Sequence, residues 1–173
     1  MDTLNLPKPR RIDEAVPANL RSGIRHDADG ALLMLPRPAP AALLGTYAGD
    51  VSPQLAWQWV QAGEAVLVDV RSDAEREWVG FVPGAVAVAW KQWPGMAMNP
   101  QFDEAICQAG AGGHKLVLLC RSGVRSIAAA QRATELGLMA YNILGGFEGD
   151  PDAHAHRGSK GGWRHQGLPW RQN

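Results

Sequence analysis

The sequence has only two cysteines among its 173 residues, Cys107 and Cys120, and it lacks an excess of charge of either sign. Two cysteines at this separation form neither a disulfide framework nor a zinc-binding spacing, so a reduced, cytoplasmic setting is expected. Because 17 basic side chains balance 17 acidic ones, we expect no nucleic-acid partner. Its apolar runs fall far short of a membrane span, and the first ten residues lack the apolar core of a signal peptide, so we expect no membrane partner either.

Proline is concentrated at the start of the chain. Residues 1–48 contain Pro7, Pro9, Pro17, Pro36, Pro38 and Pro40, with arginine and aspartate between them. This composition predicts a proline-rich N-terminal extension. Residues 49–173 are expected to form one domain that ends in an irregular tail from about residue 150.

Apolar runs alternate with helical patterns along the domain. We expect strands at 65–70, 85–89, 116–120 and 142–144, and helices at 53–62, 72–79, 100–109 and 126–136. Ser52-Pro53 and the Ser72–Glu75 spacing are typical helix starts. Strands that alternate with helices predict an α/β fold with a mainly parallel central sheet flanked by helices. The seven tryptophans are scattered, and we interpret them as packing residues.

Cys120 ends an apolar run and precedes a short polar loop and a strong helix former. Ligand sites of open α/β sheets lie at this end of the strands. A thiolate here is stabilised by the helix N-terminus, by loop amides and by Arg121 and Arg125, so the sulfur is a candidate nucleophile. The alternative is an inert, buried cysteine, which is the commoner role of this residue type. Cys107, inside a helical pattern, is interpreted as a core residue.

Three blocks in order resemble the rhodanese-like sulfurtransferases. Residues 67–71 with Glu75 and then 80–85 resemble the first signature of that family, and 120–126 resembles its active-site loop. The glycines and aromatic residues at 145–147, 162–163 and 167–169 resemble its C-terminal signature. Phe81 departs from the pattern, because the family usually has histidine there. The resemblance implies a rhodanese-like three-layer fold.

The resemblance also implies a reaction. Cys120 attacks the outer sulfur of thiosulfate or a similar anionic donor and becomes a persulfide, and sulfite leaves. A thiol, a protein cysteine or cyanide then removes the sulfur, in a two-step covalent mechanism. No metal and no cofactor are expected beyond this covalent intermediate. His154, His156 and His165 do not complete a metal-ligand spacing.

The resemblance implies a role for each residue of the loop after Cys120. The residues expected to bind the substrate are Arg121, Ser122, Gly123, Val124, Arg125 and Ser126. Their amides are expected to curl around the sulfur, the two arginines to bind the anionic donor, and Ser126 to cap the helix or donate to the persulfide. Asp69, Arg71 and Glu75 are expected to support the loop, with Arg71 pairing with Glu75 and Asp69 accepting from loop amides.

Three other functions stay open at this point. The protein could be a persulfide carrier that serves a protein partner with little thiosulfate turnover, or a non-catalytic rhodanese-type binding module. The intact Cys120 argues against the second of these. A phosphatase of the same fold is disfavoured, because Arg125 follows Cys120 one residue sooner than the phosphatase pattern requires.

Overall fold

The computed structural model describes residues 24–26, 32–34 and 46–173. The chain divides into two units, Met1–Arg37 and Pro38–Asn173. In the first unit, β1 (Ile24–His26) pairs antiparallel with β2 (Leu32–Met34). The rest of the proline-rich extension expected at 1–48 lies almost wholly outside the described residues, so its character stays a prediction.

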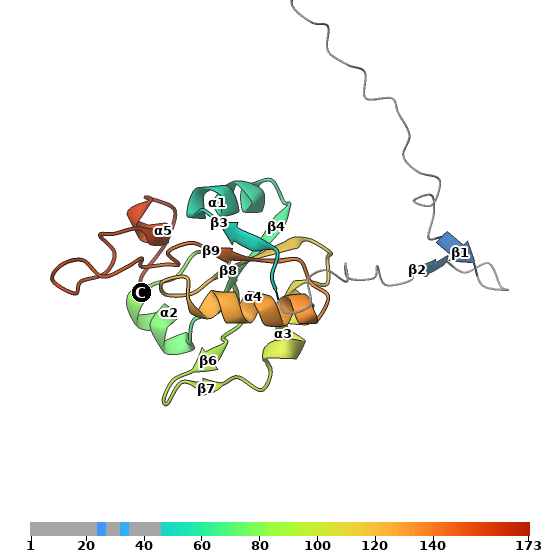
Figure 1. Cartoon of the computed structure of the whole chain (residues 1–173), viewed down its shortest axis with the longest axis horizontal. Coiled ribbons are helices and arrows are strands. Elements are labelled where there is room, and N and C mark those ends of the chain that lie inside the picture. Colours follow the sequence, from blue (N-terminus) through green and yellow to red (C-terminus); the bar gives the residue numbers. More distant parts are fainter. Residues whose placement is uncertain (1–23, 27–31, 35–45) are drawn as a thin grey trace, which may run out of the picture. The chain divides into compact units, whose positions relative to one another are not determined.

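A parallel sheet of five strands forms the centre of the second unit (Figure 1). The strand order is β3-β9-β8-β4-β5. The strands are β3 (Gly49–Val51), β4 (Ala65–Asp69), β5 (Val86–Ala87), β8 (Lys115–Leu119) and β9 (Ala140–Ile143). The α/β class and the mainly parallel central sheet are therefore confirmed.

Helices cover both faces of this sheet, as Figure 1 shows. On one side lie α1 (Pro53–Gln61) and the short α5 (Gly162–His165), and on the other α3 (Phe102–Ala109) and α4 (Arg125–Glu135). Along β8, Leu116 and Leu118 pack into one buried cluster, whereas Val117 and Leu119 pack into the other. Burial on both faces explains why the strand sequences are continuous apolar runs.

The helix starts that the sequence predicts are confirmed. Ser52 accepts a hydrogen bond from the backbone N–H of Leu55, and Pro53 occupies the first turn of α1. At α2 (Asp73–Val79), Ser72 and Glu75 form a reciprocal capping box. Both motifs satisfy N–H groups that the first turn of a helix leaves without partners.

Some boundaries and burial predictions were wrong. β5 covers only Val86–Ala87 of the run expected at 85–89, because an edge strand pairs on one side alone. Between β5 and the next helix, where no strand is expected, the chain forms a hairpin of β6 (Lys91–Gln92) and β7 (Ala97–Met98). The expected core residue Cys107 is exposed, because α3 turns Phe102 and Ile106 inward instead.

The C-terminal tail returns to the domain. Trp163 of α5 is fully buried, and its ring packs edge-on against Trp57 with centroids 5.7 Å apart. Further along, Arg171 forms an isolated antiparallel bridge with Phe81. Within the described part of the chain, we find no helix with both the length and the apolarity needed to cross a membrane.

Candidate active site

Cys120 lies at the carboxyl end of β8, the central strand of the sheet. It is 1% exposed. The backbone N–H of Gly123 donates to its Sγ at 3.1 Å, and the hydroxyl of Ser126 lies 3.2 Å from the same atom. Gly123 has φ of +87°, a backbone conformation that favours glycine. Of the loop amides at 121–126, all within the described residues, Gly123 supplies the one hydrogen bond to sulfur that the structure shows.

The segment after β9 supports this loop from behind. Phe147 donates its N–H to the carbonyl of Cys120 at 2.7 Å, and Glu148 donates to the carbonyl of Arg121 at 2.9 Å. Between them and the strand, Gly146 has φ of +55°, and a Cβ at this position would overlap the backbone of the loop. Gly146 therefore allows the segment after β9 and the Cys120 loop to approach closely.

Arg125 is held by a carboxylate. Its two terminal nitrogens donate to Glu75 at 2.8 and 2.5 Å, and both side chains are about four-fifths buried. Arg125 belongs to the loop that follows Cys120, and the carboxylate of Glu75 neutralises its charge. Glu75 also accepts from Ser72 at the start of α2, so one carboxylate joins that helix to α4.

The ionisation of Glu75 is strongly favoured. Burial raises the pKa of Glu75, but hydrogen bonds from Arg125 and Ser72, together with the charge of Arg125, outweigh it and lower the pKa from 4.5 to about 2. Because the folded-state pKa lies below the ordinary value, the ionised carboxylate stabilises the fold above pH 4.5. This stabilisation is lost as the pH falls toward 2.

Glu75→Gln should therefore lower the free energy of unfolding at neutral pH by about 1–2 kcal/mol, a range reduced for the partial exposure of the pair. The difference from the unmodified protein should shrink as the pH falls from 4.5 to 2. Urea unfolding at a series of pH values measures the loss of unfolding free energy and its dependence on pH. Glu77→Gln on the exposed side of the same helix is the control, and a pH dependence equal to that of Glu75→Gln would contradict the prediction.

The expected pairing of Arg71 with Glu75 was wrong, and each side chain has a different partner. The guanidinium of Arg71 donates to Asp69 at 2.6 Å and to the carbonyl of Gly80 at 2.8 Å. Asp69 accepts the backbone N–H of Arg71, and the structure shows no hydrogen bond from the loop amides to it within the described residues. Both side chains are at most 1% exposed, and a fully buried cation requires a partner this close.

The Arg71–Asp69 pair still supports the site, through different contacts. The guanidinium of Arg71 stacks over the ring of Phe147, with 4.0 Å to its centroid. Because Phe147 donates to the carbonyl of Cys120, the buried pair fixes the segment on which the loop rests.

A cavity of about 650 Å³ opens beside the loop. Arg121, Ser122, Val124 and Arg125 of the loop line it, and most of the other lining residues are apolar. There Trp78 of α2 and Trp93 before the β7 strand are 67% and 60% exposed, so the interpretation of every tryptophan as a packing residue was wrong for these two. Exposed apolar side chains that surround a cavity are typical of a binding surface.

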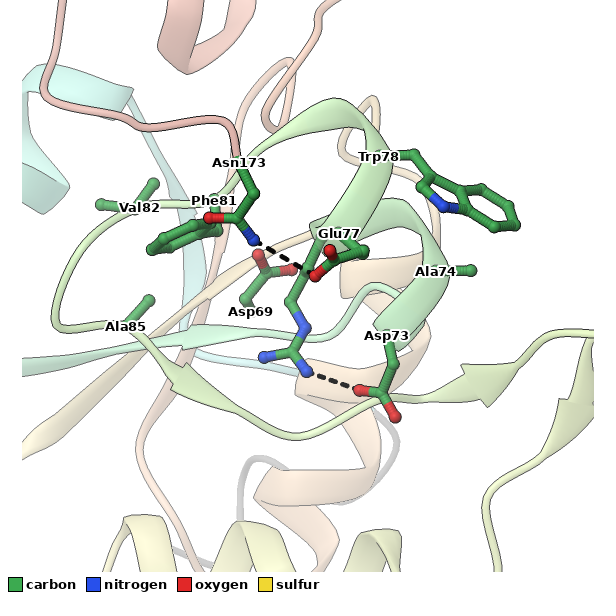
Figure 2. A pocket seen from close by; sticks show the side chains of 10 residues that line it. Asp69, Asp73, Ala74, Glu77, Trp78, Phe81, Val82, Ala85 and Asn173 are labelled. Atoms are coloured by element: carbon green, nitrogen blue, oxygen red, sulfur yellow. Dashed lines mark hydrogen bonds and ion pairs between the residues drawn. The ribbon is translucent and has the colours of Figure 1, made fainter.

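A second cavity, of about 510 Å³, lies on the other side of α2 and is drawn in Figure 2. The figure shows Asn173 reaching Glu77, and Trp78 pointing away from Phe81. The carboxylates that line it already have partners, since Asp69 pairs with Arg71 and Asp73 with Arg76. Neither Cys120 nor the residues of its loop line this cavity, so it is separate from the candidate active site.

Comparison with known proteins shows which family this chain resembles. The family described as rhodanese-like domain matches residues 52–150. The chain is 29% identical over 121 residues to the thiosulfate sulfurtransferase GlpE of Actinobacillus succinogenes, covering 69% of this chain and 87% of that protein. It is 34% identical over 111 residues to an uncharacterized protein of Rickettsia conorii, covering 61% and 82%.

Two solved structures are also similar to this chain. The crystal structure of Rv0390 from M. tuberculosis is 43% identical, with a TM-score of 0.64, and covers 74% of this chain and all of that one. A polysulfide-sulfur transferase homodimer from Wolinella succinogenes shares the fold at 19% identity and a TM-score of 0.51, covering 76% of this chain and 83% of that one.

Proposed function

The chain belongs to the rhodanese-like domain family, and we propose that it moves sulfane sulfur from thiosulfate or a similar anionic donor to a thiophilic acceptor through a persulfide on Cys120. The observation that carries the proposal is the position of the sulfur: it lies at the end of the central strand, 3.1 Å from the amide of Gly123, in a loop whose two arginines line a cavity. The name of the A. succinogenes relative supports thiosulfate as the donor.

The proposed reaction has two steps. A bond forms between Cys120 Sγ and the outer sulfur of thiosulfate while the sulfur–sulfur bond of the donor breaks, and its electron pair leaves with sulfite. A thiol, cyanide or a protein cysteine then takes the outer sulfur and restores Cys120. Because the nucleophile must be reduced, we propose that the protein works in the cytoplasm.

Arg121 is the cation that we propose attracts the donor. It lines the cavity and is exposed, and the structure shows no side-chain partner for it among the described residues, whereas Arg125 is neutralised by Glu75. Arg121→Ala should raise the KM for thiosulfate by about tenfold with little change in thermal stability, because a hydrogen bond to a charged group contributes about this much. Steady-state kinetics measure the effect. The control is Lys160→Ala, an exposed cation outside the cavity, and an equal KM in both variants would contradict the role of Arg121.

A second candidate function is supported by the shape of the same cavity. Its volume greatly exceeds that of thiosulfate, and Trp78, Trp93 and the 70% exposed Val124 form an apolar rim. Such a rim favours a bulky acceptor, as expected for a persulfide carrier that serves a protein partner. Slow turnover of the persulfide by cyanide, with fast transfer to a protein thiol, would favour this function.

Intact-protein mass after incubation with thiosulfate tests both candidates. A gain of one sulfur atom that maps to Cys120 and disappears on addition of cyanide is the expected result. No gain with thiosulfate, with an organic persulfide or with a protein persulfide would refute sulfur transfer and favour the binding module.

A further inference from the structure

The three most exposed of the large apolar side chains in the described part of the chain all line the cavity beside the Cys120 loop. Val124 is 70% exposed, Trp78 67% and Trp93 60%. They come from three separate elements, since Val124 directly precedes α4, Trp78 lies on α2 and Trp93 lies in the turn of the β6–β7 hairpin. Exposed apolar side chains that gather at one place mark an interaction surface.

The exposure of these side chains indicates the size of what binds there. Side chains that enclose a small ligand are largely covered by their own neighbours, whereas these three stand more than half in solvent. Trp78 and Ala74 of α2 also line the second cavity, and Figure 2 shows both projecting away from Val82 and Ala85. The apolar surface therefore continues across α2, and a small thiol inside one cavity would leave most of it uncovered.

The composition of the lining is that of a protein–protein interface. Tryptophan, methionine and arginine are enriched in the centre of such interfaces, and lysine is depleted. The lining contains Trp78, Trp93, Met96, Arg121 and Arg125, and no lysine is among the described residues that form it. A segment of a protein fits this lining better than a polar metabolite does.

The charge of the cavity indicates the charge of the partner. Its charged residues are Glu75, Arg121 and Arg125, and the ion pair between Glu75 and Arg125 leaves Arg121 as the excess cation. In the proposed two-step reaction sulfite leaves before the acceptor enters, so Arg121 is available again when the acceptor arrives. A carboxylate on the acceptor complements this charge.

We propose that Trp78, Trp93, Val124 and Arg121 form an acceptor surface, which docks a segment of an acceptor protein whose reactive cysteine has apolar neighbours and a nearby carboxylate. The inference rests on the proposed function for the transfer step. In that step the thiolate of the acceptor attacks the outer sulfur of the Cys120 persulfide. A new sulfur–sulfur bond forms on the acceptor, the bond to Cys120 Sγ breaks, and its electron pair stays on Sγ.

The test is equilibrium binding, measured by fluorescence anisotropy with short dye-labelled peptides. Serine replaces the acceptor cysteine in each peptide, so the measurement needs neither a donor nor sulfur chemistry. A peptide with leucines and glutamates around the serine should bind at least about tenfold more tightly than one with lysines for the glutamates, or one with serines for the leucines. Absence of binding by the apolar acidic peptide, or equal binding of all three, would overturn the proposal.

Substitutions in the acceptor surface test each contact. Trp78→Ala and Trp93→Ala should each raise the Kd of the apolar acidic peptide at least about fivefold, because truncation of a central tryptophan commonly has this effect at interfaces. Both side chains are exposed, so the fold should persist, and thermal unfolding checks it. The control is Met139→Ala, which truncates an exposed apolar side chain that lies before β9 and outside the cavity. Effects no larger than that of the control would overturn the proposal.

The charge is tested separately. In Arg121→Ala, the peptides with glutamates and with lysines should bind about equally, because the excess cation is absent. Continued preference for the glutamate peptide would contradict the role of Arg121 in docking.

Two other occupants of the acceptor surface are outcomes of the test. A dimer in sedimentation that Trp78→Ala dissociates would show that a second copy of this chain covers the surface, and would overturn the proposal. Equal slowing by Trp78→Ala of persulfide transfer to N-acetylcysteine and to the cysteine form of the peptide would also overturn it, in favour of a small thiol. Failure of Cys120 to gain sulfur from any donor would refute the proposed function alone, because peptide binding is measured without it.

Discussion

Cys120→Ser should reduce sulfur uptake from thiosulfate by at least about a thousandfold, because removing the nucleophile of a covalent mechanism removes the reaction path itself. The fold should persist, since a serine hydroxyl at this position can keep the contacts with the Gly123 amide and the Ser126 hydroxyl. Thiocyanate formation from thiosulfate and cyanide measures the loss, and thermal unfolding measures the stability.

The matched control is the other cysteine. Cys107 lies exposed on α3, and Cys107→Ser should keep full activity and full stability. Retention of sulfur uptake in Cys120→Ser, with its loss in Cys107→Ser, would contradict the assignment of the nucleophile.

Gly146→Ala should reduce the rate of sulfur uptake about a hundredfold, the loss expected when a reacting group is displaced by about 1 Å. A Cβ on this residue would overlap the carbonyl oxygen of Cys120 and backbone atoms of Arg121 and Ser122. Because all three contacts are with backbone, no side-chain rotation relieves them and the loop must shift. The unfolding free energy should also fall, by about 2–4 kcal/mol, from steric overlap added to an unfavourable φ.

Gly137→Ala separates these two effects. Gly137, which follows α4, has φ of +85°, but a Cβ there has no neighbouring atom within 4 Å. It should lose only the roughly 1 kcal/mol of the left-handed conformation and keep its activity. Equal losses of activity in the two variants would show that backbone strain alone, and not displacement of the loop, is responsible.

Local patterns predicted the local structure well. The capping box at Ser72 and Glu75 and the proline at the start of α1 are confirmed, because caps depend on residues within one turn. The strand before Cys120 and the helix after it are confirmed within a residue, as β8 and α4. The sequence analysis missed β3 and the β6–β7 hairpin. Their strands have only two or three residues, which is too short to show a periodic pattern of apolar residues.

Partners that are distant in the sequence were not predictable. Glu75 binds Arg125, fifty residues away, and Asn142 binds Asp50, ninety-two residues away. Which carboxylate a cation meets depends on the strand order of the sheet, which no spacing in the sequence encodes. The expected pairing of Arg71 with Glu75 was wrong, because Arg71 is buried beside Asp69 and pairs with it.

The sequence by itself determined that Cys120 follows a buried strand and enters a glycine-containing loop before a helix, because hydrophobic periodicity and caps act within a few residues. The tertiary structure decided what surrounds this cysteine. Sheet order brings Gly146, Asn142 and Glu75 to the loop, and these contacts fix its backbone and pair its arginine. Long-range packing sets such contacts, since every partner comes from a different element of the fold.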